Sequence, residues 1–473
     1  MDKSLPNILA ARKRIASSKI VKNIFKLDAS LTKIGKNKTF FVRTYGCQSN
    51  IRDSEILKGI LIKMCYKECD DINNANLVIL NTCAIRENAE KKVFGEIGLL
   101  KKQKNKDFVF GISGCMAQEP EVVEKIITKY PYVSFVIGTH NIYELPHILE
   151  EHYKTNKQII KVYSKEGDII ENLPNVRDSK TKAWVNIMYG CDNFCTYCIV
   201  PYTRGKLRSR DKEDIINEVN ELIKQGYKEV TLLGQNVNSY GLDKKDGYYF
   251  VDLLNDVCLT KIPRVRFTTS NPWNFDKKIA DLCIKHKNLM PFFHLPIQSG
   301  DEKILKNMNR EMKIKTYVSL INYIRKRVPN CAISTDIIVG FPNETKKQFN
   351  NTVKLYKKIK FDNAYTFIYS KRVGTPASKI LDKINLNEKY LRLEKLNNLV
   401  RKYSKENNQK FLNKVLPVLV EGKSKTNKDV WTGYSPQWKV VNFTGKCKVG
   451  DIVNVKICEV SRFSLKAEIV DTN

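Results

Sequence analysis

The stretch YGCDNFCTYCIVPYTRG (residues 189–205) carries three cysteines, Cys191, Cys195 and Cys198, within eight residues. A structural zinc site normally takes four Cys or His ligands, and this stretch contains neither a fourth cysteine nor a histidine. Three thiolates on one loop fit a 4Fe-4S cluster that keeps one iron open to another ligand. The spacing therefore predicts an iron–sulfur site, and the alternative is three ordinary buried cysteines in a loop.

The region from residue 183 onward, which includes this stretch, alternates between strands and helices. Six segments read as strands that run into loops, and helical segments separate most of them: AWVNIMYGC, EVTLLGQNVNSYG, RVRFTTSNP, PFFHLPIQSG, CAISTDIIVGFPNET and NAYTFIYS. Strands that alternate with helices predict parallel pairing, so this region is expected to form a full or partial β/α barrel. Such a barrel carries its chemistry at the carboxyl ends of its strands.

A second set of βα units precedes the barrel. TFFVRTYGC, ANLVILNTCAI and DFVFGISGCMA each read as a strand, and they contain Cys47, Cys83 and Cys115 at or just before their ends. In a parallel sheet, ligands sit beyond the carboxyl ends of the strands. Three scattered cysteines are usually core residues, but one cysteine at each strand end predicts that the three meet at one sheet edge and hold a second cluster.

The remaining segments differ from these βα regions. Residues 1–38 are basic, with an amphipathic helix expected around Ile15–Leu27 and a transit peptide as an alternative, and a polar segment near 151–180 reads as a linker. Near the carboxyl end, hydrophobic residues such as Val453 and Val455 alternate with polar ones, which predicts a small β-barrel. The expected domains are an arm at 1–38, an α/β parallel-sheet domain at 39–155, the barrel at 177–409 and an all-β barrel at 410–473.

The composition restricts the class of protein. The chain has 473 residues, of which 42% are hydrophobic, so two to four packed domains are expected. No apolar run approaches the roughly 18 residues that a membrane helix needs, and no segment reads as a signal peptide. Thirteen cysteines, an odd number, argue against a disulfide framework and favour reduced thiols in the cytoplasm.

The net charge of +32 favours a polyanionic partner, most simply a nucleic acid. A bias of the host toward Lys, Asn and Ile is the alternative explanation. The expected carboxyl-terminal β-barrel favours a nucleic-acid partner, because barrels of this kind bind RNA through charge and aromatic stacking. The candidate RNA contacts are Trp431, Trp438 and Phe463.

The C-x3-C-x2-C spacing after the first strand of a β/α barrel resembles the signature of radical S-adenosylmethionine (SAM) enzymes. The resemblance implies that Cys191, Cys195 and Cys198 are catalytic through a 4Fe-4S cluster, whose open iron binds the amino and carboxylate groups of SAM. An electron then cleaves SAM into methionine and a 5′-deoxyadenosyl radical, so the cofactor carries the hard chemistry. The residues expected at the SAM site are Tyr197, Gln235, Asn236, Ser270, Asp336 and Gly340.

The whole layout resembles the radical SAM methylthiotransferases over roughly residues 39–470. The segments YGCQSNIRDSE, NTCAIRENAEKKVFGEIG, GCDNFCTYCIVPYTRG, LLGQNVNSYG and HLPIQSGD are similar to the MiaB-type branch. Ser49 departs from that branch, in which many members have Met at this place. The resemblance implies a partial (β/α)6 radical SAM barrel, a terminal TRAM barrel, and an auxiliary 4Fe-4S cluster on Cys47, Cys83 and Cys115.

The branch converts N6-isopentenyladenosine at position 37 of tRNA into its 2-methylthio form, and the same activity is implied here. One SAM methylates a sulfur at the auxiliary cluster, and the radical made from a second SAM abstracts hydrogen near the adenine C2. The implied partners are the anticodon stem-loop of tRNA and an electron donor such as flavodoxin or ferredoxin, with the enzyme a cytoplasmic monomer away from membranes. A base in this loop is only partly stacked, which favours its removal for chemistry.

Other functions remain open at this point. Close relatives of the branch modify threonylcarbamoyladenosine in tRNA or an aspartate of a ribosomal protein. The segments GQNVN and AIRENAEKKV favour the isopentenyl branch over these two. From other classes, an RNA-binding iron–sulfur sensor without a SAM site and a zinc-containing RNA-binding protein also fit the cysteines and the charge.

Overall fold

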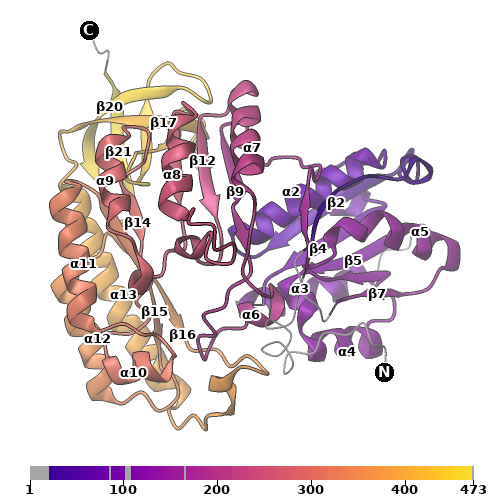
Figure 1. The fold of residues 1–473 in the computed structure, drawn as a ribbon, viewed down its shortest axis with the longest axis horizontal. Helices are drawn as coiled ribbons and strands as arrows, with labels where there is room; N and C mark the ends of the chain where they lie inside the picture. Colours follow the sequence, from indigo (N-terminus) through magenta and orange to yellow (C-terminus); the bar gives the residue numbers. More distant parts are fainter. Residues whose placement is uncertain (1–20, 85–86, 102–107, 164–166, 471–473) are drawn as a thin grey trace. The chain divides into compact units, whose positions relative to one another are not determined.

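The computed structural model describes residues 21–84, 87–101, 108–163 and 167–470 (Figure 1). No helix in this part of the chain is long and apolar enough to cross a membrane.

The chain forms two compact units. The carboxyl-terminal unit contains residues 179–187, 195–197 and 211–473. The amino-terminal unit contains the chain up to Asp178 together with residues 188–194 and 198–210, so parts of the cysteine-rich stretch belong to each unit.

The amino-terminal unit is built on a six-stranded, all-parallel sheet in the order β3-β2-β4-β5-β6-β7. Its strands are β2 (Thr39–Tyr45), β3 (Lys67–Glu68), β4 (Leu77–Thr82), β5 (Val109–Gly114), β6 (Phe135–Ile137) and β7 (Ile159–Lys161). Its main helices are α2 (Gln48–Lys63), α3 (Glu87–Leu100), α4 (Pro120–Lys129) and α5 (Leu145–Thr155).

Helices cover both faces of this sheet, because the central strands are apolar on both sides. In β4, Leu77 and Ile79 pack with α2 and α5, whereas Val78 and Leu80 pack with α3 and α4. This is the alternation of a strand whose successive side chains point to opposite faces. The predicted parallel α/β domain is confirmed.

Strands β2, β4 and β5 are neighbours in the sheet. Cys83 directly follows β4, Cys115 directly follows β5, and Cys47 lies two residues beyond the end of β2. Because parallel strands present their carboxyl ends at one edge, the three cysteines lie at the same edge of the sheet. Their predicted placement is therefore confirmed.

Two predictions about the polar segments are wrong. Lys22–Ile24 forms strand β1, which pairs in parallel with β8 (Ile169–Glu171), so the described part of the expected helix is extended. Residues 15–20 of that expected helix lie outside the described residues. The expected linker around 151–180 contains the end of α5 and the whole of β7, which pairs with β6. It therefore completes the amino-terminal sheet.

The carboxyl-terminal unit contains six parallel strands in chain order, as predicted. They form two three-stranded sheets, joined through the parallel bridge between Val265 and Leu289. The strands are β9 (Lys182–Asn186), β12 (Glu229–Leu233), β13 (Arg264–Phe267), β14 (Phe292–His294), β15 (Ala332–Val339) and β16 (Asn363–Ile368). The intervening helices are α7 (Lys212–Lys224), α8 (Phe250–Leu259), α9 (Lys278–Lys285), α10 (Glu302–Asn307), α11 (Ile314–Arg327) and α12 (Lys346–Ile359).

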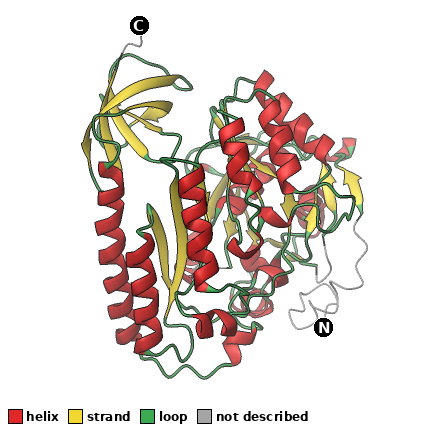
Figure 2. Cartoon of the chain, turned by 60° about the vertical axis from the view of Figure 1, so that its left-hand side comes forward, coloured by secondary structure: helices red, strands yellow, loops and turns green. Residues whose placement is uncertain are grey.

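The long helix α13 (Leu386–Gln409) follows the barrel and starts at Asn385, whose side chain accepts a hydrogen bond from the N–H of Glu388. A closed five-stranded barrel comes after it, with the strand order β17-β18-β19-β21-β20. Figure 2 shows this small barrel in yellow beside the carboxyl terminus. Its strands are β17 (Val415–Lys423), β18 (Trp431–Tyr434), β19 (Val440–Thr444), β20 (Ile452–Val460) and β21 (Ser464–Ile469).

The small barrel closes the amino-terminal end of the large one. Arg264 and Arg266, both buried on β13, donate hydrogen bonds to the carbonyl oxygens of Pro417 and of residues 434–436 at 2.7–2.9 Å. These carbonyl groups satisfy the terminal nitrogens of the two buried guanidinium groups, while Oε2 of Glu229 on β12 lies 2.9 Å from Nε of Arg266.

The ring of Trp438 completes this closure. Its centroid lies 5.0 Å from the ring of Phe292, the first residue of β14, and 6.5 Å from the ring of Trp184, the third residue of β9. The guanidinium of Arg266 lies 4.9 Å from the same indole. We call this arrangement of Arg264, Arg266 and Trp438 the barrel floor.

Candidate active site

The first two cysteines of the amino-terminal set are tied together by buried amides. Both the backbone N–H and the thiol of Cys47 donate to Oδ1 of Asn50, at 3.3 and 3.4 Å. Nδ2 of Asn50 donates to Oδ1 of Asn81 and to the carbonyl oxygen of Thr82, at 3.0 and 3.2 Å. This network starts helix α2 and binds the loop that carries Cys47 to the end of β4, where Cys83 follows.

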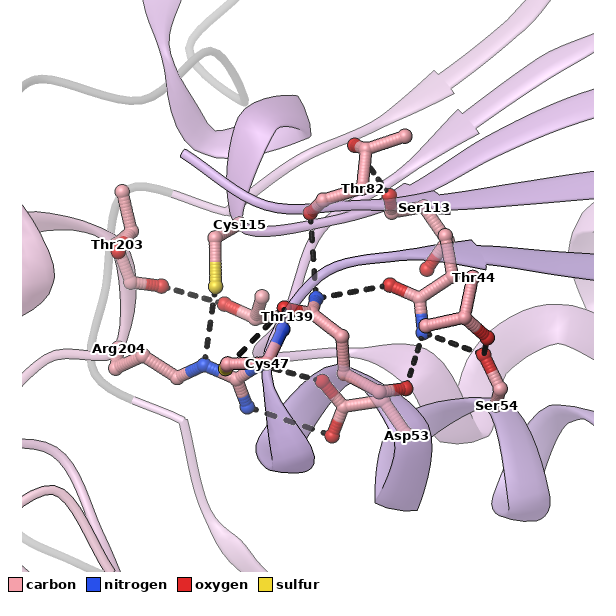
Figure 3. A network of polar contacts seen from close by, with 12 residues as sticks. Thr44, Cys47, Asp53, Ser54, Thr82, Ser113, Cys115, Thr139, Thr203 and Arg204 are labelled. Atoms are coloured by element: carbon pink, nitrogen blue, oxygen red, sulfur yellow. Dashed lines mark hydrogen bonds and ion pairs between the residues drawn. The ribbon is translucent and has the colours of Figure 1, made fainter. Parts of the chain in front are cut away.

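Arg204 lies directly beside this set (Figure 3). Its Nε donates to Sγ of Cys115 at 3.1 Å, and its two terminal nitrogens donate to the carboxylate of Asp53 at 3.3 and 2.6 Å. Arg204, Cys115 and Asp53 are all buried. A guanidinium that binds a carboxylate through two nitrogens is held in a fixed orientation, so its third donor is aimed at the sulfur.

The charge of Arg204 influences the thiols around it. A hydrogen bond with Cys83 lowers the pKa of Cys47 to about 5, with a further lowering by Arg204, although burial acts in the opposite direction. Burial raises the pKa of Cys115, and Arg204 opposes that rise. Burial alone would lower the pKa of Arg204, but Asp53 and Cys115 raise it well above its usual value. Arg204 therefore stays charged.

Within the described ranges, no group of three or more His, Cys, Asp or Glu side chains is arranged as a metal site. The chemistry of the donors nevertheless fits an iron–sulfur cluster. Three thiols follow adjacent strands, Cys47 interacts with Cys83, and a buried cation lies beside Cys115. Thiolate ligands are what cluster irons bind, and a nearby cation favours thiolates.

The cysteines of the quoted stretch belong to both units. Cys191 and Cys198 lie in the amino-terminal unit, and Cys195 lies in the carboxyl-terminal unit. The N–H of Cys191 donates to the carbonyl oxygen of Gly205 at 3.0 Å, and Nδ2 of Asn193 donates to its sulfur at 3.3 Å. These contacts fix the first cysteine of the triplet.

A second buried arginine faces Cys195. Nη1 of Arg310 lies 3.8 Å from Sγ of Cys195 and 3.2 Å from the hydroxyl of Tyr197, and Nη2 donates to the carbonyl oxygen of Pro296 at 2.5 Å. The guanidinium also lies 4.4 Å from the centroid of the Trp273 ring. Among the described residues, no carboxylate lies within ion-pair distance of Arg310.

Three predicted SAM-site residues lie in the loops after β12 and β13. Gln235 is half-buried, whereas Asn236 is buried, donates to Ser239 at 2.6 Å and accepts from the N–H of Asn271 at 3.0 Å. Asn236 thus joins the two loops. Oγ of Ser270 is buried and has no hydrogen-bond partner among the described residues. Buried hydroxyl groups normally have such a partner, so this hydroxyl is available to bind a ligand.

The other two lie on or after β15. Oδ2 of Asp336 is 3.4 Å from Nε2 of His294. Gly340 has a φ of +68°, and a Cβ there would lie 2.6 Å from Cγ of Lys389. Its N–H donates to Oε2 of Glu344 at 2.9 Å. This turn requires glycine, while a direct role of these residues in SAM binding stays a prediction.

The three predicted RNA contacts have different surroundings. Phe463 is 71% exposed. Nε1 of Trp431 donates to the carbonyl oxygen of Gly445, and Nζ of Lys423 lies 3.9 Å from the centroid of its ring. The ring of Trp438 is engaged in the barrel floor. The structure therefore leaves Phe463 the most accessible of the three.

Comparisons with known proteins agree with this layout. The chain matches the model of the Radical SAM superfamily over residues 185–356, that of the Uncharacterized protein family UPF0004 over 39–138 and that of the TRAM domain over 409–470. It is 56% identical over 471 residues to the tRNA-2-methylthio-N(6)-dimethylallyladenosine synthase of Malacoplasma penetrans, covering 99% of this chain and 96% of that protein. The chain belongs to the tRNA-2-methylthio-N(6)-dimethylallyladenosine synthase family. It is an enzyme of the radical SAM superfamily, whose members use a 4Fe-4S cluster and SAM.

A second relative supports the same assignment. The synthase of Bacillus subtilis is 49% identical, with 98% of this chain and 92% of that protein covered. Among solved structures, the radical S-adenosylmethionine methyltransferase TsrM from Kitasatospora setae is similar at a TM-score of 0.54 and 12% identity, covering 72% of this chain and 77% of that one. At that identity the likeness concerns the fold alone.

Sequence reasoning missed Arg204, Asp53 and Arg310. Arg204 lies inside the quoted cysteine stretch and Asp53 inside the segment YGCQSNIRDSE, and these positions were the available signals. Arg310 gave none, because charged residues are frequent in a chain with 82 Lys and Arg and 50 Asp and Glu.

Proposed function

We propose that this enzyme methylthiolates C2 of N6-isopentenyladenosine at position 37 of tRNA. The observation that carries the proposal is the meeting of Cys47, Cys83 and Cys115 at one sheet edge beside Arg204, in a chain that also has the radical SAM signature. The name shared by the relatives, tRNA-2-methylthio-N(6)-dimethylallyladenosine synthase, supports the substrate.

Cys191, Cys195 and Cys198 would hold the radical SAM cluster. When bound, this cluster delivers the electron that cleaves SAM into methionine and a 5′-deoxyadenosyl radical. The chain positions the second ligand, since Arg310 contacts the sulfur of Cys195 and is itself fixed by Tyr197. The unpartnered hydroxyl of Ser270 and the turn at Gly340 would receive SAM.

Cys47, Cys83 and Cys115 would hold an auxiliary 4Fe-4S cluster, which supplies the sulfur of the methylthio group. Asn50 ties the loop that carries Cys47 to the end of β4, and Arg204 donates to Cys115. These contacts fix the thiols before any ligand arrives, which is how a buried site holds a large cofactor in one orientation.

The partners in this proposal are the anticodon stem-loop of tRNA and a one-electron donor such as flavodoxin or ferredoxin. The net charge of +32 and the exposed Phe463 on the TRAM barrel support RNA binding. We further propose that the enzyme acts as a cytoplasmic monomer, with a radical SAM domain over residues 177–409 and a terminal TRAM domain over residues 410–473.

Two triple variants test the proposal. Replacing Cys47, Cys83 and Cys115 with Ala should leave slow formation of 5′-deoxyadenosine but abolish methylthiolated adenosine, because the radical is made elsewhere. Replacing Cys191, Cys195 and Cys198 with Ala should abolish both products. The products are quantified by mass spectrometry after anaerobic reconstitution with iron and sulfide.

Iron analysis accompanies these assays. Wild-type protein should contain about eight irons per chain, and each triple variant about four, as expected for two 4Fe-4S clusters. A matched control replaces Cys65, Cys69 and Cys458, which belong to neither set, and should keep all the iron. Normal methylthiolation without Cys47, Cys83 and Cys115 would remove the auxiliary cluster from the proposal.

A further inference from the structure

The last strand of the large barrel presents two aromatic side chains to its inner side. Tyr365 and Phe367 on β16 are 51% and 42% exposed. Thr366, between them, donates to Oδ1 of Asn397 on α13 at 2.5 Å, so helix α13 covers the opposite face of the strand. Because side chains alternate along a strand, Tyr365 and Phe367 both point away from the helices.

The strand register identifies the neighbours of these rings. Tyr365 lies opposite Asp336 on β15, and Phe367 lies opposite Ile338. His294 on β14 joins the same surface, since its ring centroid is 5.9 Å from that of Tyr365 and its Nε2 is 3.4 Å from Asp336. His294, Asp336, Tyr365 and Phe367 thus form one continuous surface, which we call the inner aromatic face.

One end of the inner aromatic face lies near the cysteine loop. Ile338, the cross-strand neighbour of Phe367, packs against an apolar cluster that also contacts Tyr197. Tyr197 stands between Cys195 and Cys198 in the sequence. Phe367 therefore marks the end of the face next to the radical SAM cysteines, and Tyr365 lies one step farther away.

The chemistry of this face suits a purine that carries an apolar substituent. Aromatic rings stack on bases, and two side chains on one face of a strand are about 7 Å apart. Tyr365 and Phe367 are about half exposed, so an extruded base can reach their rings. Asp336 and His294 place polar groups beside the rings, where the edge of a base can be bound.

We propose that the inner aromatic face binds the target base of the RNA, with the purine ring on Phe367 and its dimethylallyl group against Tyr365. This inference rests on the proposed function. The orientation follows from the reaction, because the reacting carbon C2 must face the cysteine loop and the N6 substituent leaves the ring in a different direction. Tyr365 is then a specificity-determining residue and Phe367 a positioning one.

Binding measurements on the full-length, reconstituted enzyme separate the two roles. The probes are anticodon stem-loop RNAs with N6-dimethylallyladenosine or adenosine at position 37, followed by fluorescence anisotropy. Wild-type enzyme should bind the dimethylallyl RNA more tightly. Tyr365→Ala should reduce that preference about tenfold and leave the affinity for the adenosine RNA unchanged. Phe367→Ala should lower the affinity for both RNAs about tenfold, which is the size expected for one lost stacking contact.

Matched variants control for folding. Tyr365→Phe and Phe367→Tyr keep a ring at each place and should retain most of the wild-type behaviour. Tyr390→Ala removes a similarly exposed ring on α13 and should change neither affinity. Equilibrium dialysis of SAM should give the same dissociation constant for all the variants.

The outcomes distinguish the inference from the proposed function. A full preference for the dimethylallyl RNA in Tyr365→Ala overturns the inference and leaves the proposed function intact. Weaker SAM binding with unchanged RNA affinities would also overturn it, because the rings would then hold the nucleoside of SAM. If the wild-type enzyme shows no preference, the proposed substrate fails and the inference fails with it.

Discussion

The amino-terminal unit and the barrel each place a buried arginine on a cysteine sulfur, but the two arginines differ in their counter-charge. Arg204 contacts Cys115 and is bound through two nitrogens by Asp53. Arg310 contacts Cys195 and is held by a hydroxyl, a carbonyl oxygen and an indole ring, without a carboxylate in the described part of the chain.

The two sites therefore differ in the net charge that lies beside the cysteine sulfur. The pair of Arg204 and Asp53 is neutral as a whole, so it orients a donor toward Cys115 while adding little net charge. Arg310 keeps a full positive charge in a buried place. A buried charge is costly unless something opposite balances it, and thiolates or an anionic ligand at Cys195 would do so. In the barrel site, the charge of Arg310 is therefore balanced only when the cysteines are thiolates or an anionic ligand is bound.

The largest expected effect comes from separating the pair in the amino-terminal unit. Asp53→Asn leaves the charge of Arg204 buried without a carboxylate, which should cost about 3–5 kcal/mol of local stability. Hydrogen exchange of the α2 amides in cluster-free protein measures this loss. Adding Arg204→Met to the same protein should restore most of the protection, because both charges are then gone. A loss below about 1 kcal/mol in the single variant would show that Asp53 does not balance Arg204.

A smaller effect is expected from removing the unbalanced charge in the barrel. Arg310→Met should lower the reduction potential of the radical SAM cluster by on the order of 100 mV, since a nearby cation stabilises the more negative reduced state. Titration monitored by electron paramagnetic resonance measures the potential. Arg310→Lys keeps the positive charge, so its potential should fall by at most half as much as that of Arg310→Met. The neutral double substitution Asp53→Asn, Arg204→Met should lower the auxiliary potential by less than this, because it removes a hydrogen bond to Cys115 but no net charge. Equal shifts at the two clusters would contradict the comparison.

The smallest effect concerns the support of Arg310. Tyr197→Phe removes the hydroxyl that lies 3.2 Å from Nη1 but leaves the ring in its apolar cluster. One hydrogen bond contributes about 0.5–1.5 kcal/mol, so the thermal midpoint of the carboxyl-terminal unit should fall by a few degrees at most. Calorimetry of cluster-free protein tests this. A loss as large as that of Asp53→Asn would mean that Tyr197 has a structural role beyond this contact.

The sequence was sufficient to predict the elements that depend on local pattern. Each strand that ends at Cys83 or Cys115 is a short apolar run between turns, and such runs predict buried parallel strands. The order of the barrel strands followed from their alternation with helices. Because the carboxyl ends of parallel strands gather at one edge, the strand pattern alone also predicts where the amino-terminal cysteines lie.

The remaining features depend on contacts that local pattern does not record. Lys22–Ile24 is extended because it pairs with Ile169–Glu171, a partner far away in the chain. The same holds for Arg204 and Asp53, which are brought together by the fold. In the same way, the covering of one face of NAYTFIYS by helix α13, which leaves Tyr365 and Phe367 on the other face, depends on a contact with a distant segment.

The barrel floor has a consequence for how the chain is made. The six barrel strands are complete at Ile368, but Trp438 and the carbonyl groups that bind Arg264 and Arg266 leave the ribosome about 70 residues later. At roughly 5–20 residues per second, the nascent barrel lacks these carbonyl acceptors for about 4–14 s, and during this time Glu229 on β12 is the ion-pair partner of both guanidinium groups. The final domain thus acts as the last step of assembly for the catalytic core, and a chain that terminates early ends with an open barrel.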